Sequence, residues 1–201
     1  MVRIVSDTST LYSTTQAKEA GFRVSPLSVT IAGKTYREFD DISSEQFVDI
    51  IRQGHMPTSS QPASGEVEEL YNCYPDDKII NVAMAHGLSG TYTSAVAAAQ
   101  MCDHADKITV INTRTLCGPH RYMVEKALEW AKDGLGVEAI VEKLHELGVK
   151  AIVLRCAGFN NVDLRACRGK LRVLTANTTP SASGAIHPRS IPRRSISAAF
   201  A

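Results

Sequence analysis

The chain has 201 residues, of which 44% are hydrophobic, and a formal net charge of +1, so its length allows one ordinary domain or one domain and part of a second. No stretch approaches the ~18 to 20 unbroken apolar residues of a membrane span, and Met1–Asp7 lacks the long apolar run of a secretion signal. Five cysteines without any CxxC spacing argue against a zinc site or a disulfide framework, and they favour reduced thiols in the cytoplasm.

The chain begins with a strand, a short helix and a hairpin. The polar cluster Asp7–Thr10 forms the strand-to-helix loop, and Gly21 ends the helix. Two β-rich runs around the glycine-containing turn Ala32–Thr35 predict the hairpin. In order, the sequence predicts a strand at Arg3–Ser6, a helix at about Thr15–Ala20, and a hairpin of Leu27–Ile31 with Tyr36–Phe39.

The next helix has clear end signals. Ser43 is a capping residue, and Gln46 three residues later completes a capping box. Phe47 and Ile50 follow at helical spacing, and a glycine ends the helix. The segment His55–Ser64 is rich in Ser, Thr and Pro and is predicted to be a polar loop.

The remaining elements alternate between helices and strands. They are a helix at Glu66–Tyr74, a strand at Lys78–Ala85, a tight loop at His86–Gly90, a helix at Thr91–Met101, a strand at Ile108–Asn112, helices at Gly118–Lys132 and Val137–Leu147, and a strand at Ala151–Leu154. This alternation predicts an α/β fold, a layered and mostly parallel sheet flanked by helices. Ligands of such sheets bind outside the carboxyl ends of the strands.

Charge marks a boundary near residue 154. Residues 1–154 carry 14 basic and 20 acidic side chains, a net charge of −6, whereas residues 155–201 carry 8 basic side chains and one acid, a net charge of +7. The second segment is rich in Arg, Ser, Pro and Ala, and no convincing strand or helix is expected after about Val173. The sequence therefore predicts an α/β lobe over 1–154 and a tail of low order over 155–201.

Two loops offer groups for binding an anion. Pro57–Pro62 and Gly87–Tyr92 each present hydroxyls directly before a helix. Helix N-termini carry unpaired N–H groups and favour anions, and Ser or Thr hydroxyls donate to carboxylate oxygens. The alternative is that these hydroxyls only cap the helices.

Other kinds of site are less well supported. Ser89 lies in Gly-Leu-Ser-Gly and not in the GxSxG motif of hydrolases, yet a small serine-dependent hydrolase or transferase stays an alternative. Asp40 and Asp41 precede a helix, where acids complement the helix dipole, so no metal site is expected. Asp7 is expected to organise its loop through hydrogen bonds. The lobe is acidic, and no nucleic-acid face is expected.

In these loops and in the order of its motifs, the chain resembles the DegV family of bacterial fatty-acid-binding proteins. The resemblance covers Ile4 to about Leu154. The segments that carry it are Ile4–Ser9, Pro26–Leu27 with Gly33–Tyr36 and Asp41–Ser43, Ser59–Pro62, and Leu88–Tyr92 with Ser94–Ala95. Ser59 stands where the family usually has Thr, His86 where it more often has Ser, and Asn112 where it often has Asp.

The resemblance implies two α/β lobes that enclose a long-chain fatty acid, with no cofactor and no catalytic group. It implies that the hydroxyls of Ser59 and Ser89 hold the carboxylate. Supporting roles fall to the rest of the two loops and to the first strand end, namely Ser60, Gly90, Thr91 and Asp7. It also implies that the protein presents its fatty acid to a separate fatty acid kinase subunit.

The second lobe of the family is not recognisable after Leu154. The hypothesis for residues 155–201 is a truncated gene product or out-of-frame translation, because acids and hydrophobic periodicity disappear together. A single lobe would leave most of an acyl chain exposed to water. A nonfunctional fragment is therefore the other alternative.

Overall fold

The computed structural model describes residues 1–147, 151–154, 169 and 172–175. The chain divides into two compact units, Met1–Leu147 and Gly148–Ala201. The first unit contains two sheets with their helices, and the described part of the second contains one pair of strands.

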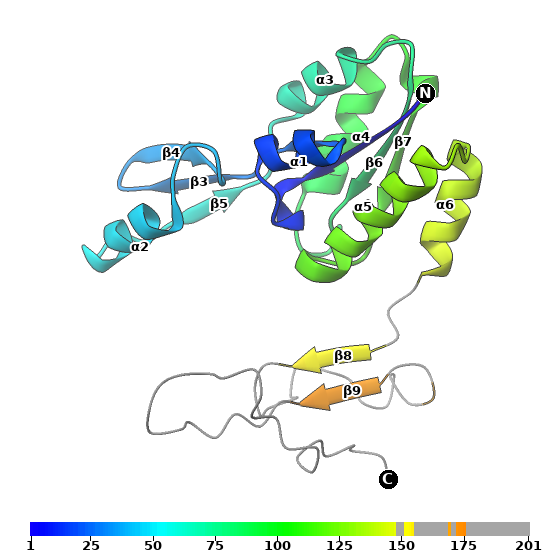
Figure 1. Ribbon diagram of the computed structural model, residues 1–201. Helices are drawn as coiled ribbons and strands as arrows, with labels where there is room; N and C mark the ends of the chain where they lie inside the picture. Colours follow the sequence, from blue (N-terminus) through cyan, green and yellow to red (C-terminus); the bar gives the residue numbers. More distant parts are fainter. Residues whose placement is uncertain (148–150, 155–168, 170–171, 176–201) are drawn as a thin grey trace. The chain divides into compact units, whose positions relative to one another are not determined.

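The larger sheet has four parallel strands in the order β2-β1-β6-β7 (Figure 1). They are β1 (Val2–Asp7), β2 (Arg23–Ser25), β6 (Lys78–Ala83) and β7 (Ile108–Asn112). In the central strands, Val5 pairs with Arg23 on one side and with Asn81 on the other. The predicted α/β fold with a parallel sheet is confirmed.

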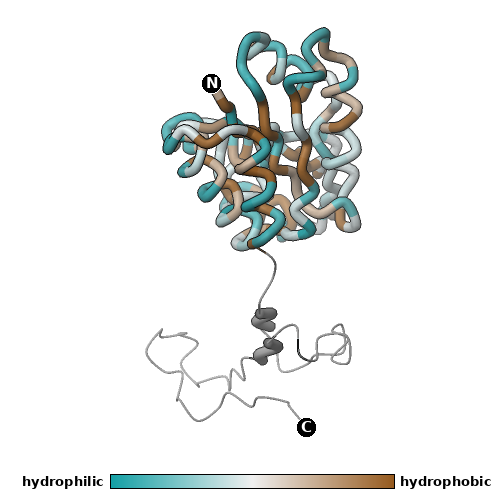
Figure 2. Tube along the Cα trace, turned by 90° about the vertical axis from the view of Figure 1, so that its right-hand side faces the viewer, coloured by the Kyte–Doolittle hydropathy of each residue, from teal (hydrophilic) through white to brown (hydrophobic). Residues whose placement is uncertain are grey.

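Helices cover both faces of this sheet and bury its apolar residues. One face packs against α1 (Thr14–Ala20), α5 (Cys117–Lys132) and α6 (Val137–Glu146). The other packs against α3 (Ser64–Asn72) and α4 (Thr91–Met101). Figure 2 shows the hydrophobic strands inside this unit, with hydrophilic segments around them. Two short 3-10 helices, η1 (Thr8–Thr10) and η2 (Ala105–Lys107), follow β1 and precede β7.

The smaller sheet is antiparallel, in the order β4-β3-β5, and is accompanied by α2 (Ser44–Arg52). The predicted hairpin forms β3 (Ser28–Ile31) and β4 (Lys34–Arg37). The prediction of a loop over His55–Ser64 is wrong in part, because Thr58–Ser60 forms β5. This strand forms through pairing with β3, where Val29 lies opposite Ser59, and local composition does not reveal such a distant partner.

Capping boxes begin two of the helices. The predicted box at Ser43 and Gln46 is present at α2, where each residue bonds to the backbone of the other. A second box, at Ser13 and Gln16, starts α1 one residue earlier than predicted. Each box satisfies two backbone N–H groups of a helix N-terminus.

The second unit contains β8 (Ala151–Leu154) and β9 (Arg172–Thr175), which pair in parallel. The strand at Ala151–Leu154 is confirmed and belongs to this unit. β9 corrects the expectation of no strand after about Val173, since a four-residue strand with a distant partner leaves little periodicity in the sequence. The rest of the predicted tail lies outside the described residues.

Candidate functional site

Asp7 ties together the carboxyl ends of β1 and β6. Its side chain is buried, the Ser9 N–H donates to Oδ1 (2.9 Å), and the Met84 N–H donates to Oδ2 (3.1 Å). The expectation that Asp7 organises its loop by hydrogen bonding is confirmed. Both carboxylate oxygens are bonded to the backbone, so Asp7 shapes this edge of the sheet.

His120, in α5, contacts the same edge of the sheet. The Val82 carbonyl lies 2.8 Å from Nε2 and can only accept, so Nε2 donates to it, and Nδ1 lies 2.8 Å from the Ser9 hydroxyl oxygen. The ring is fully buried. Sequence reasoning missed His120, although it lies three residues before Met123 and seven before Ala127, on the buried face of α5.

Ser89 lies at the N-terminus of α4. Its oxygen accepts from the Thr91 N–H (3.2 Å) and lies 2.8 Å from the Thr91 hydroxyl. This bond supports the capping alternative for the Ser89 oxygen. The two hydroxyls share one hydrogen bond between them, so one of their two hydrogens remains available to a ligand in the described structure.

The two predicted loops come together at this helix end. The Ser94 hydroxyl donates to the Pro62 carbonyl at 3.0 Å. The Gln61 amide lies so close to Gly90 that a Cβ at this position would overlap it. Gly90 has an ordinary negative φ of −72°, so a larger residue here would strain no backbone angle but would displace the Gln61 side chain. No hydrogen bond joins Ser59 to Ser89 among the described residues.

An apolar pocket of about 360 Å³ lies between the smaller sheet and α2. This volume is within the ~300 to 1,000 Å³ typical of small-molecule sites. The exposed residue Ser59 is part of its wall. The lining residues are Leu27, Ser28, Val29, Glu38, Phe39, Ile42, Ser43, Ser44, Phe47, Pro57 and Ser59. Most of the side-chain surface that they offer to a ligand is apolar.

Glu38 is the acidic group in that wall. The Thr8 hydroxyl donates to Oε2 (2.7 Å) and accepts from the Leu27 N–H (3.0 Å). Burial raises the pKa of Glu38, the nearby Asp7 carboxylate raises it further, and the bond from Thr8 opposes both effects. A partly buried carboxyl with a raised pKa in a cleft is typical of functional sites.

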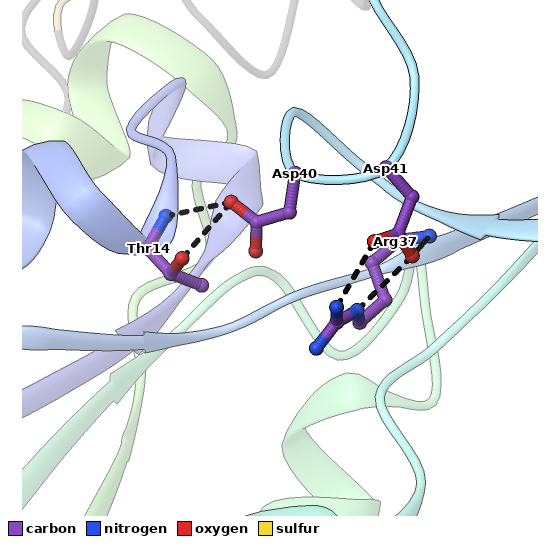
Figure 3. A network of polar contacts seen from close by, with 4 residues as sticks. All are labelled: Thr14, Arg37, Asp40 and Asp41. Atoms are coloured by element: carbon purple, nitrogen blue, oxygen red, sulfur yellow. Dashed lines mark hydrogen bonds and ion pairs between the residues drawn. The ribbon is translucent and has the colours of Figure 1, made fainter.

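Asp40 and Asp41 both accept hydrogen bonds next to the smaller sheet, but only Asp40 reaches another element, α1 (Figure 3). Asp40 accepts from the backbone N–H (3.3 Å) and the hydroxyl (2.9 Å) of Thr14. Asp41 accepts twice from the Arg37 guanidinium, at 2.9 and 3.0 Å, and these bonds lower its pKa to about 2. The expected role beside a helix dipole falls instead to Glu45, in the first turn of α2.

The geometry gives Ser89 no catalytic base. His86 lies 3.4 Å from the Thr93 hydroxyl, and no histidine bonds to Ser89 in the described ranges. Within the described part of the chain, the serines that contact a histidine in this way are Ser6 and Ser9, both with His120, and all three side chains are buried. Among the same residues, no group of three metal-binding side chains and no helix able to cross a membrane is found.

Comparison with known proteins places this geometry in a family. The protein-family model described as "Uncharacterised protein, DegV family" matches residues 1–154 of the sequence. A DegV domain-containing protein of Staphylococcus aureus (strain N315) is 35% identical over 146 residues, which are 72% of this chain and 52% of that protein. A DegV domain-containing 15.5 kDa protein of Staphylococcus aureus is 36% identical over 128 residues, 63% of this chain and 90% of that protein.

Solved structures of DegV family proteins also resemble this chain. A DegV family protein from Thermus thermophilus, described by its fatty acid binding, is 28% identical with a TM-score of 0.67, over 73% of this chain and 52% of that one. DegV from Bacillus subtilis, described as a fatty acid binding protein, is 28% identical with a TM-score of 0.65, over 72% and 52%. The chain thus spans about half the length of most of these relatives. From its parallel sheet, its ordered motifs and a family match over residues 1–154, we conclude that the chain belongs to the DegV family.

Proposed function

We propose that this lobe binds a long-chain fatty acid. The acyl chain would occupy the apolar pocket, and the hydroxyls of Ser59 and Ser89 would hold the carboxylate. The observation that carries the proposal is the pocket itself, because Ser59 is one of its lining residues. From Ser59 the chain continues to Gln61 and Pro62, which lie against the N-terminal end of α4.

The proposed site has an apolar part, the pocket, and a polar part, the N-terminus of α4, as the binding of an amphiphile requires. Each CH₂ removed from water contributes about 0.8 kcal/mol, and the pocket supplies apolar contacts for several of them. The N-cap of α4, Gly90, makes no side-chain cap bond. The Ser89 oxygen already accepts the Thr91 N–H, so in this proposal an anion would use the other N–H groups of the first turn and the free hydroxyl hydrogen of the Ser89–Thr91 pair.

The remaining residues of the two loops have supporting roles in this proposal. Ser60 continues β5 beyond Ser59, and Gly90 leaves room for Gln61. Thr91 shares its hydrogen bond with Ser89, and Asp7 fixes the edge of the sheet. The fatty acid binding of the Thermus and Bacillus proteins supports a fatty acid as the ligand.

Lipid copurification followed by mass spectrometry, and titration of the purified chain with palmitate, test the proposal. Ser59→Ala and Ser89→Ala should each weaken palmitate binding about 10- to 100-fold, since a hydrogen bond to a charged group contributes about 1.5–3 kcal/mol. Thr93→Ala is the matched control, an exposed hydroxyl in the first turns of α4, and should bind as the original chain does. Equal affinity in all four proteins would refute the assignment.

A fluorophosphonate probe distinguishes lipid binding from the alternative of a serine-dependent hydrolase. If the protein binds lipid and is no hydrolase, the probe should leave Ser89 unlabelled, because the described structure places no base beside it. Labelling at Ser89 would favour the enzyme. Lack of lipid binding together with a non-cooperative thermal transition would favour the nonfunctional fragment.

Two further parts of the proposal concern partners and the tail. Presentation of the bound acid to a fatty acid kinase subunit predicts that such a subunit phosphorylates palmitate only when this chain is added. An out-of-frame origin of residues 155–201 predicts DegV-like coding in another frame beyond the codon for Leu154. Sequencing of the locus checks this origin.

A further inference from the structure

Glu38 stands out in the pocket because every other lining side chain is apolar or a serine. Its backbone N–H donates to the Leu27 carbonyl at 2.8 Å, so Glu38 continues the β3–β4 ladder opposite Leu27. Both residues line the pocket together with Val29. No ion pair links Glu38 to a basic side chain within the described residues.

We propose that Glu38 couples filling of this pocket to the uptake of one proton, so that the pocket binds an acyl chain best with Glu38 protonated. The inference rests on the proposed function, because it takes the pocket as the site of the acyl chain. It assigns to that site a regulation by pH through one named side chain.

The coupling follows from desolvation. The carboxyl of Glu38 is only partly buried in the open pocket. An acyl chain against the wall replaces solvent there with CH₂ groups, which cannot hydrogen-bond. Removing an ionised carboxylate from water costs far more than removing the neutral acid. The acyl chain therefore binds more tightly to the protonated form.

Of the groups around Glu38, one favours protonation and one opposes it, and the opposing bond from Thr8 is the stronger of the two, although burial outweighs it. Asp7, at the end of β1, adds negative charge and favours protonation, whereas the Thr8 hydroxyl of η1 favours the ionised form. The neighbour directly before β3 is Leu27, and the pocket-lining residues Ser44 and Phe47 of α2 carry no charge. Arg37, the residue before Glu38 in the sequence, is paired with Asp41.

The pH dependence has a definite sign. The pKa of Glu38 is already raised in the free protein, and a bound acyl chain raises it further. Between the free and the bound pKa, affinity rises up to about tenfold for each unit by which the pH falls. A cationic amphiphile would show the opposite trend, because ionised Glu38 would attract it.

Isothermal titration calorimetry with 1-decanol tests the coupling, since this probe has an alkyl chain and a head group that does not titrate. Titrations of the full chain at pH 5, 6, 7 and 8, in two buffers of different ionisation enthalpy, report affinity and proton uptake together. The original chain should take up as much as one proton and lose affinity as the pH rises. Glu38→Gln should take up none and bind equally at every pH.

Glu45→Gln is the matched control, because Glu45 is an exposed acid at the start of α2 that does not line the pocket. It should behave as the original chain does. Equal proton uptake by Glu38→Gln and the original chain would overturn the inference and leave lipid binding intact. Failure of both 1-decanol and decanoate to bind would overturn the proposed function and the inference with it.

A second measurement does not depend on the folding of a variant. The carboxyl carbon of Glu38 can be titrated by NMR in the original chain, with and without saturating 1-decanol. The midpoint should move to higher pH when the probe is bound. An unchanged midpoint with bound probe would contradict the coupling.

Discussion

The two sheets of the first unit are built in opposite ways. In the central sheet, β6 is buried along Ile79–Ala83, with helices on both faces. In the smaller sheet, β5 is exposed throughout, and α2 has no buried residue. The first arrangement excludes water and stabilises the fold, whereas the second leaves an apolar pocket open to a ligand.

The difference also appears in what joins the two regions. Apolar packing holds the helices on the central sheet, but polar contacts tie the smaller sheet to it, chiefly Thr8 with Glu38 and Thr14 with Asp40. Polar contacts contribute less stability than buried apolar area. The smaller sheet should therefore open more readily than the central one.

The largest expected effect is a difference in the free energy of unfolding between two variants, each with one isoleucine replaced in one of the two regions. Ile80→Ala in β6 removes a side chain with 0% exposure and should lower the free energy of unfolding by about 2–5 kcal/mol. Ile51→Ala in α2 removes a side chain with 38% exposure and should cost less than about 1 kcal/mol. Urea denaturation measures both. Similar losses would show that the two regions are equally packed.

A smaller effect is expected at the junction of the sheets. Thr8→Val keeps the buried shape but removes the hydroxyl that bonds to Glu38 and Leu27, which should cost about 1–3 kcal/mol. Hydrogen exchange should accelerate at the amides of β3 and β5 and stay slow in β6. Thr35→Val, at an exposed hydroxyl bonded to Thr30, is the control. Uniform acceleration in both sheets would contradict the proposed junction.

The smallest effect concerns the exposed pair of Arg37 and Asp41. The pKa of Asp41 is lowered from 3.8 to about 2 by the guanidinium and the backbone N–H of Arg37. Its stabilising contribution is therefore fully present above pH 3.8 and is lost as the pH falls through about 2. An NMR titration of the Asp41 carboxyl carbon should show this low midpoint, and Arg37→Gln should return it towards 3.8. A midpoint that Arg37→Gln does not move would assign the shift to another cause.

Much of the central sheet could be predicted because its signals are local. The apolar run at Lys78–Ala85 and the alternation of strands with helices predicted the parallel layers, and Ser43 with Gln46 predicted the start of α2. The loop position of Ser89 before α4 was also a local feature, whereas Ser59 lies in β5 and not in the predicted loop. Their shared grip on a carboxylate stays a prediction, because the described contacts join Gln61 to Gly90 and Pro62 to Ser94.

The sequence by itself determined the order of the elements and the character of each surface, since hydrophobic periodicity and capping residues act over a few positions. Only the tertiary structure decided which distant groups meet: Val29 with Ser59, Ser9 with His120, and Thr8 with Glu38. These contacts connect residues that are 30 to 111 positions apart. They depend on the packing of several elements at once, which no local pattern encodes.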